Sequence, residues 1–281
     1  MPVIPLEDEL GDVLDKALHC ADLNEEGLAA RSGVSVEKIQ NLEDYRYDEL
    51  TDDDLRRLAA ALHLNEVGLC ALARNRYPRP RVTGLPFCVH PIRLPFGVGV
   101  VNAYAVVDCA TGVGVLFDGG TGYDALRQAW PRAVTRIEAV FLTHPEAEHL
   151  GGVAGVLREH GLAAFYGPRG EACKLSAWPL GEGETVVASG YQITAFRTPG
   201  HAAEHNCYVV RPKGVPHARA LLISGDLIFA GSLGGGYFSC EQLLQHARRI
   251  LNALPGPTVI APGHGPMTTV ENERQYNPFL V

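Results

Sequence analysis

The chain has 281 residues, of which 46% are apolar and 20% are charged, a composition typical of folded globular proteins and not of disordered ones. No run approaches the ~18 consecutive apolar residues of a membrane span, and the acidic start of the chain lacks the basic flank of a secretory signal, so we expect no membrane contact. The seven cysteines are scattered, odd in number and never form C-x-x-C. This pattern predicts neither a disulfide framework nor a cysteine zinc site, and it favours a reducing cytoplasm.

The net charge of −8 is unevenly distributed along the chain. Residues 1–76 contain 17 acidic and 8 basic residues, whereas residues 77–281 contain 15 and 16. Pro78 and Pro80 follow this change in composition and oppose the continuation of a helix. We therefore predict a small acidic domain at 1–76, a linker at 77–85 and a larger, nearly neutral domain at 86–281.

The acidic domain is predicted to be all-α, because apolar residues recur at helical spacing on both sides of Gly33 and residues 51–54 form a capping-box pattern. The run GLAARSGVSVEKIQNLE resembles the helix-turn-helix of the Cro/repressor-type family, with Gly33 in the turn and residues 35–42 as the recognition helix. A duplex repels an acidic module, so charge argues against DNA without excluding it. The alternative is a helical cap, or a module through which two chains form a homo-oligomer.

Strand patterns dominate the larger domain. Helical patterns occur at 150–160 and 240–254, and strand patterns at 87–94, 100–108, 114–118, 138–143, 185–189, 191–198, 206–210, 220–224 and 258–262. Two groups of strands, each accompanied by helices, predict a layered α/β fold.

Potential metal ligands follow four of these strands directly. The candidates are His144, Glu146, Glu148 and His149 after 138–143, His201 after 191–198, Asp226 after 220–224 and His264 after 258–262. Loops that follow strands place side chains at one edge of a sheet, where rigid elements hold a site. Four histidines and three carboxylates suffice for two metal ions that share a bridging ligand. His205 is interpreted as a structural or supporting residue.

The motifs THPEAEHLGG, TPGH, SGD and PGHG occur in the order found in the metallo-β-lactamase superfamily, which residues 86–281 resemble. This resemblance implies an αββα sandwich with a two-metal site at one edge. The stretches SGDLIFAGSLGG and PGHGPMTTVENERQYNPFL are similar to those of the glyoxalase II branch, the hydroxyacylglutathione hydrolases. Three features depart from the family pattern. Glu146 replaces a histidine, as in flavodiiron proteins, Glu148 replaces an aspartate, and Gly235 replaces an arginine of that branch.

The resemblance also implies a role for each candidate ligand. One ion takes His144, Glu146 and His201, the other takes Glu148, His149 and His264, and Asp226 bridges both. Relative to the usual ligand set, Glu146 adds a negative charge and an oxygen donor, which shifts the preferred metal from zinc toward iron or manganese. Asp226 and Glu148 are the catalytic candidates, although Glu148 serves either as a ligand or as a proton acceptor. Asp118 either orients a ligand histidine or caps a turn.

Three functions are compatible with these patterns. The preferred one is a metal-dependent hydrolase that cleaves a thioester or related ester of a small-molecule substrate through a hydroxide bridging the two ions. The second is a di-iron protein that binds or reduces oxygen or nitric oxide, or oxidises a sulfur substrate. The third is a metal-dependent sensor whose helical domain acts on DNA or on a protein partner.

Overall fold

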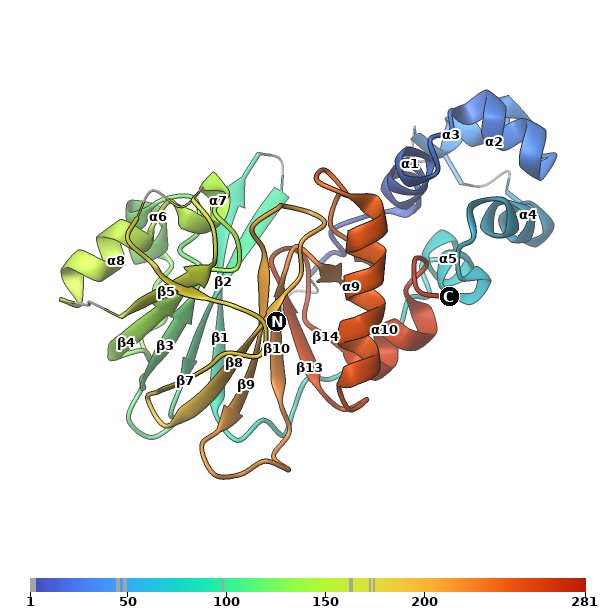
Figure 1. Cartoon of the computed structure of the whole chain (residues 1–281). Coiled ribbons are helices and arrows are strands. Elements are labelled where there is room, and N and C mark those ends of the chain that lie inside the picture. The colour runs from blue at the N-terminus through green and yellow to red at the C-terminus, as the bar shows by residue number, and fades with distance from the viewer. Residues whose placement is uncertain are drawn as a thin grey trace.

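The computed structural model describes residues 4–43, 46–47, 50–97, 99–161, 164–171, 173 and 175–281. Two six-stranded sheets pack face to face, and helices cover the outer face of each sheet (Figure 1). The predicted αββα sandwich with a helical N-terminal region is therefore confirmed. Within the described part of the chain, no helix has both the length and the apolar character needed to cross a bilayer.

The first sheet has the strand order β1-β2-β3-β4-β5-β6. Strands β1 to β3 are antiparallel, and β3 to β6 are parallel. The strands are β1 (Cys88–Phe96), β2 (Gly99–Val107), β3 (Val113–Phe117), β4 (Arg136–Phe141), β5 (Phe165–Pro168) and β6 (Trp178–Leu180), with helices α6 (Tyr123–Gln128), α7 (Ala147–Leu150) and α8 (Val153–Glu159) in the connections.

The second sheet has the order β14-β13-β10-β9-β8-β7 and one parallel pair, β10 with β13. Its strands are β7 (Thr185–Ala188), β8 (Tyr191–Arg197), β9 (Asn206–Pro212), β10 (Leu221–Gly225), β13 (Val259–Pro262) and β14 (Thr268–Thr269). Helices α9 (Cys240–Ala253) and α10 (Val270–Tyr276) lie on the outer side of this sheet (Figure 1). A separate hairpin joins β11 (Ile228–Phe229) to β12 (Ser232–Leu233). The patterns at 185–189 and 258–262 predicted the four-residue strands β7 and β13, whereas β5, β6, β11, β12 and β14 escaped prediction because strands of two to four residues carry little periodic signal.

The main core lies between the two sheets, where both sheets contribute alternate residues of their strands. Phe141 is central to it, since its ring lies 5.2 Å from that of Phe117 on the same sheet and 5.6 Å from that of Tyr208 on the other. A second apolar cluster packs the outer face of the first sheet against α6 and α8. This packing holds the strand ends, and the loops that follow them, in fixed positions.

The N-terminal module contains α1 (Leu10–Ala21), α2 (Glu25–Ser32), α3 (Val36–Glu43), α4 (Asp52–Leu62) and α5 (Glu66–Ala73). The predicted capping box forms at the start of α4, where the Asp54 amide donates to the Thr51 hydroxyl and the Thr51 amide donates to the Asp54 carboxylate. Gly33 ends α2 in the left-handed region at φ 72°, in the predicted turn. The resemblance to a helix-turn-helix stays a prediction.

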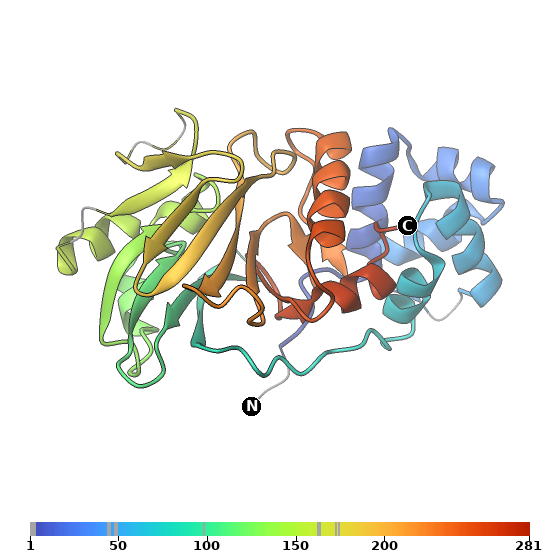
Figure 2. The same cartoon turned by 60° about the horizontal axis from the view of Figure 1, so that its bottom comes forward.

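The module shares an apolar core with the larger domain. A single cluster of buried residues runs from α1 and α4 to α9 and β9, and α9 lies between the second sheet and the module in both views (Figures 1 and 2). At the C-terminal end, the Asn65 amide donates to the Pro278 carbonyl at 2.6 Å. A Cβ atom on Gly68 of α5 would lie 2.4 Å from the Tyr276 carbonyl oxygen, so only glycine permits this close approach.

The prediction that the cysteines form no disulfides is wrong. Cys20 is bonded to Cys240, and Cys88 is bonded to Cys109. The first bond joins α1 to the first residue of α9, and 220 residues separate its two cysteines. Spacing along the chain could not reveal this pair, because the packing of the module on α9 brings the two side chains together.

Candidate metal centre

The loops after β4, β8, β10 and β13 meet at one edge of the sandwich and bring predicted ligands together around Asp226. Asp226 Oδ1 lies 3.5 Å from His149 Nε2, while Oδ2 lies 3.6 Å from His201 Nε2 and 3.4 Å from His264 Nε2. Three histidines that are distant in the sequence thus surround the carboxylate of Asp226, which has the position expected of a bridging group.

Glu146 faces this cluster from the N-terminus of α7. Its carboxylate oxygens lie 3.3 Å from His201 Nε2 and 4.0 Å from His144 Nε2. The ligand atoms of His144, Glu146 and His201, the set expected for one ion, all lie within 4.8 Å of one another, and so do those of His144, His149 and Asp226. The glutamate that replaces the family's histidine is therefore positioned to contact the same ion.

Glu148 is the predicted ligand that the structure does not bring into the cluster. It lies half-buried on α7, and among the described residues it forms no ion pair and belongs to neither candidate group. Its role as a ligand or proton acceptor stays a prediction.

Each histidine of the cluster is oriented through its Nδ1 atom, which contacts a protein acceptor. The contacts are His144 with Thr143 Oγ1 at 2.9 Å, His149 with Asp118 Oδ2 at 3.1 Å, His201 with the Gly235 carbonyl at 2.9 Å and His264 with the Val100 carbonyl at 3.0 Å. This arrangement places the ring protons on Nδ1 and leaves the Nε2 lone pairs available to a cation.

Four inward-facing atoms of this cluster are buried and have no hydrogen-bond partner. They are Nε2 of His144, His149 and His201, and Oδ1 of Asp226. A single unsatisfied buried polar atom costs about 1–3 kcal/mol, so four of them facing one another would be strongly unfavourable without a ligand. The residues therefore fit a site for divalent metal ions.

Asp118 orients two of the ligand histidines. Its carboxylate accepts hydrogen bonds from the Thr143 amide at 2.8 Å, from the Thr143 hydroxyl at 2.9 Å and from His149 Nδ1 at 3.1 Å. Because the Thr143 hydroxyl donates to Asp118, its oxygen remains free to accept the Nδ1 proton of His144. Of the two predicted roles for Asp118, the contacts favour the orientation of ligands over the capping of a turn.

His205 contacts the cluster through the backbone of Asp226. Burial lowers the pKa of His205 to about 3, so the ring stays neutral and its Nε2 accepts the Asp226 backbone N–H at 3.2 Å. Burial alone would raise the pKa of the Asp226 carboxyl, but the positive charge that His149 and His264 carry when no metal ion replaces their Nε2 protons outweighs burial and holds that pKa well below its usual value. Asp226 is therefore ionised, as a bridging ligand must be.

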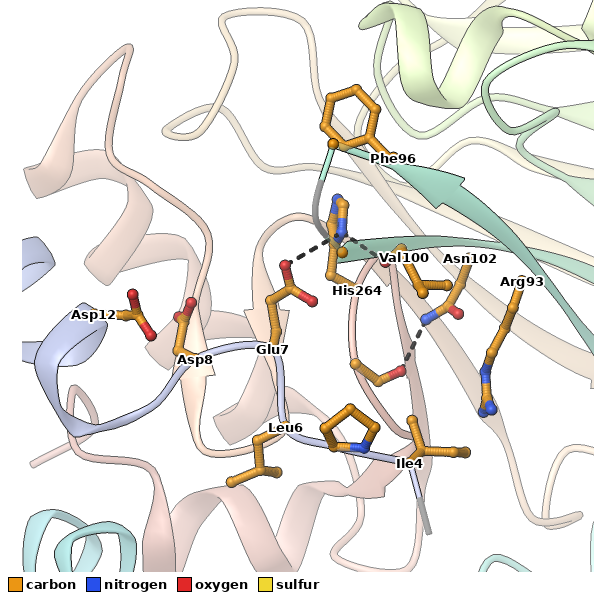
Figure 3. A pocket seen from close by; sticks show the side chains of 14 residues that line it. Ile4, Leu6, Glu7, Asp8, Asp12, Arg93, Phe96, Val100, Asn102 and His264 are labelled. Atoms are coloured by element: carbon orange, nitrogen blue, oxygen red, sulfur yellow. Dashed lines mark hydrogen bonds and ion pairs between the residues drawn. The ribbon is translucent and has the colours of Figure 1, made fainter. Parts of the chain in front are cut away.

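Sequence analysis missed the contribution of the N-terminal segment to this site. A carboxylate oxygen of Glu7 lies 3.6 Å from Nδ1 of the candidate ligand His264 (Figure 3). Asp8 beside it is buried and accepts hydrogen bonds from Ser232 and Lys16. In the sequence these acids are only part of an acidic run, and no local signal indicates that they approach a site formed near the other end of the chain.

Comparison with known proteins shows the family of the chain. The family model of the metallo-beta-lactamase superfamily matches residues 96–264. The chain belongs to this superfamily. It is 33% identical over 127 residues to the hydroxyacylglutathione hydrolase of Salmonella arizonae, a match that covers 45% of this chain and 47% of that protein. The chain thus spans about half the length of the curated relatives it matches.

Two solved structures show the same fold at higher coverage. The BLEG-1 B3 metallo-beta-lactamase is 26% identical with a TM-score of 0.56, and the match covers 69% of this chain and 100% of that one. TTHA1623 in a di-iron-bound form is also 26% identical, with a TM-score of 0.52 and coverage of 68% and 100%. The N-terminal helical module lies outside the segment that the family model matches.

Proposed function

We propose that this chain is a metal-dependent hydrolase that cleaves a thioester or a related ester of a small-molecule substrate. The observation that carries the proposal is the set of buried, unpartnered nitrogen and oxygen atoms that face one another at the sheet edge. Membership of the superfamily and the similarity to a hydroxyacylglutathione hydrolase support hydrolysis as the reaction class.

Two divalent ions fit the donor set, and iron, zinc and manganese are the candidates. One would be held by His144, Glu146 and His201, and the other by His149 and His264, with Asp226 available to both. A role for Glu148 as a further ligand stays a prediction, because it belongs to neither candidate group. When bound, such ions lower the pKa of a water molecule and polarise a substrate carbonyl. Asp118 and the carbonyls of Gly235 and Val100 keep the ring protons of His149, His201 and His264 on Nδ1, so that their Nε2 lone pairs would be available to the ions.

A panel of acyl thioesters tests this function. The protein is loaded separately with zinc, iron or manganese and incubated with S-lactoylglutathione and simpler thioesters, and release of the thiol is followed. Asp226→Asn should abolish turnover. Asp108→Asn, in a surface turn where the carboxylate contacts Ala110 and Thr111, should retain it. Absence of turnover with every metal and every thioester would overturn the proposal.

A di-iron protein is the second candidate, in which the centre binds or reduces oxygen or nitric oxide, or oxidises a sulfur substrate. The position of Glu146 between His144 and His201 favours it, because an additional carboxylate stabilises higher oxidation states. The similarity to a structure with bound di-iron supports the same idea. Metal analysis of protein produced in iron-supplemented cells tests it, and zinc alone at full occupancy would contradict it.

For the helical module, we propose a role at the metal centre in preference to DNA binding. Lys38 is the sole basic residue of the predicted recognition helix, and its ammonium group is bound by Asp54 at 2.8 Å. A cation held in this way contributes little to binding a phosphate backbone. We expect the full chain to show no salt-sensitive binding to duplex DNA in a fluorescence anisotropy titration, and such binding would restore the sensor hypothesis.

A further inference from the structure

A cavity of about 850 Å³ adjoins His264. Its first wall is the N-terminal segment that leads into α1, with Glu7 beside the apolar residues Ile4 and Leu6, and its second wall consists of β1 and β2, with Arg93 and Phe96 (Figure 3). The volume lies in the range of small-molecule binding sites. Because the cavity opens beside a candidate metal ligand, a molecule bound in it would lie next to the reacting centre.

Glu7 and Arg93 bring opposite charges to this cavity without pairing with each other. Among the described residues, Glu7 accepts no hydrogen bond, and its single ion-pair contact is His264 Nδ1 at 3.6 Å. That nitrogen already donates its proton to the Val100 carbonyl at 3.0 Å. Arg93 forms neither an ion pair nor a hydrogen bond with any residue that the structure describes. Both charged groups therefore remain available to a ligand.

The other acidic residues along this wall have partners within the protein. Asp8 accepts hydrogen bonds from Lys16 and Ser232, and Asp12 accepts the Glu9 amide at 2.8 Å as part of the cap of α1. Lys16 also donates to the Leu233 carbonyl at 2.8 Å. These contacts fix the segment against the loop that follows Asp226, so Glu7 is held at the cavity by a rigid support.

We propose that this cavity binds the zwitterionic part of the substrate, an amino-acid or short-peptide group whose ammonium is held by Glu7 and whose carboxylate is held by Arg93. Each contact would be a charge-assisted hydrogen bond to a side chain that forms no hydrogen bond with the described residues of the protein. The apolar side chains of Ile4, Leu6 and Phe96 suit an aliphatic side chain of the same group. The inference rests on the proposed function, because it names the substrate class of that same site.

Three matched dipeptides test the pocket by calorimetric titration of the full chain. Glycyl-leucine carries both charges, its N-acetyl derivative lacks the ammonium, and its C-terminal amide lacks the carboxylate. We expect each modification to weaken binding by about tenfold or more. Equal binding of all three peptides, or absence of glycyl-leucine binding, overturns the proposal.

Two variants then assign each charge to its residue. In Glu7→Gln the preference for the free amine over the N-acetyl form should disappear while the preference for the carboxylate remains, and Arg93→Gln should show the reverse. Glu159→Gln, at the end of α8 and away from the cavity, should keep both preferences. If either variant loses both preferences or neither, the assignment is wrong.

A neutral thioester separates this inference from the proposed function. The wild-type chain is assayed with the acetyl thioester of N-acetylcysteamine, which has neither an ammonium nor a carboxylate group. Turnover of this ester without discrimination among the dipeptides overturns the pocket and leaves the hydrolase function standing. Discrimination among the dipeptides without turnover supports the pocket and argues against the hydrolase.

Discussion

Replacement of Asp118 by asparagine tests how the protein orients its candidate metal ligands. The carboxylate accepts hydrogen bonds from the Thr143 amide at 2.8 Å and from His149 Nδ1 at 3.1 Å. Asparagine has nearly the same shape, but it presents an NH₂ group in place of one oxygen. If Oδ1 keeps the Thr143 amide, the NH₂ group faces His149, and the ring proton moves to Nε2. That nitrogen lies 3.5 Å from Asp226 in the centre of the cluster.

A protonated Nε2 cannot bind a metal ion, so Asp118→Asn should weaken metal binding. Loss of a supporting partner of this kind lowers metal affinity by about 10–100-fold, which corresponds to about 1.4–2.7 kcal/mol. The fold should suffer less, because the backbone amide of Thr143 retains its acceptor and a lost neutral hydrogen bond costs about 1 kcal/mol. The expected result is weaker metal binding with a small change in thermal stability.

Competition titration against a chromogenic chelator measures this effect. Wild type, Asp118→Asn and Asp108→Asn are compared, since Asp108 caps the turn at Thr111 and contacts no candidate ligand. Unchanged affinity in Asp118→Asn would refute the orientation argument. An equal loss in Asp108→Asn would show that the effect is not specific to the histidine contact.

Three further predictions concern the metal, the disulfide and the acid response. In Glu146→His, the nitrogen donor should raise the share of zinc relative to iron in purified protein, as measured by elemental analysis; an unchanged metal ratio contradicts the proposed role of Glu146. Cys20→Ser, which removes the bond to Cys240, should lower the free energy of unfolding by about 2–5 kcal/mol in denaturant titrations without reductant, whereas Cys70→Ser should change it less. The hydrogen bond from Lys38 lowers the pKa of Asp54 from 3.8 to about 2, so its contribution to stability is present above about pH 4 and is lost as the pH falls toward 2. The difference in Tm between wild type and Asp54→Asn should therefore shrink over that interval, and a constant difference would argue against the Asp54 contact.

The sequence predicted the long elements of the fold well. The alternation in residues 191–198 and the apolar period of residues 240–254 correspond to β8 and α9, because each periodicity extends over enough residues to specify its structure. The hairpin of β11 and β12 and the edge strand β14, at two residues per strand, were not predicted. Such elements exist only because neighbouring strands or loops supply their hydrogen-bond partners.

The residues of the candidate site also fall into two groups, those that local sequence could place and those that depend on tertiary packing. His144, His201, Asp226 and His264 each follow a predicted strand, so local sequence alone placed them at strand ends. The superfamily motifs then identified them as members of one ligand set. Glu7 and the cavity wall depend instead on how the helical module packs against α9, which no local pattern encodes. The bond between Cys20 and Cys240 has the same origin.

What the sequence determined by itself was therefore the chemistry of the ligands and their attachment to rigid strands, since both depend on neighbouring residues in the chain. The tertiary structure alone decided which acceptor orients each histidine, for example the Gly235 carbonyl for His201, and which residues surround the cavity beside His264. Contacts of this kind arise from packing between distant segments, and packing depends on the complementary shapes of whole surfaces and not on the order of residues within any one of them.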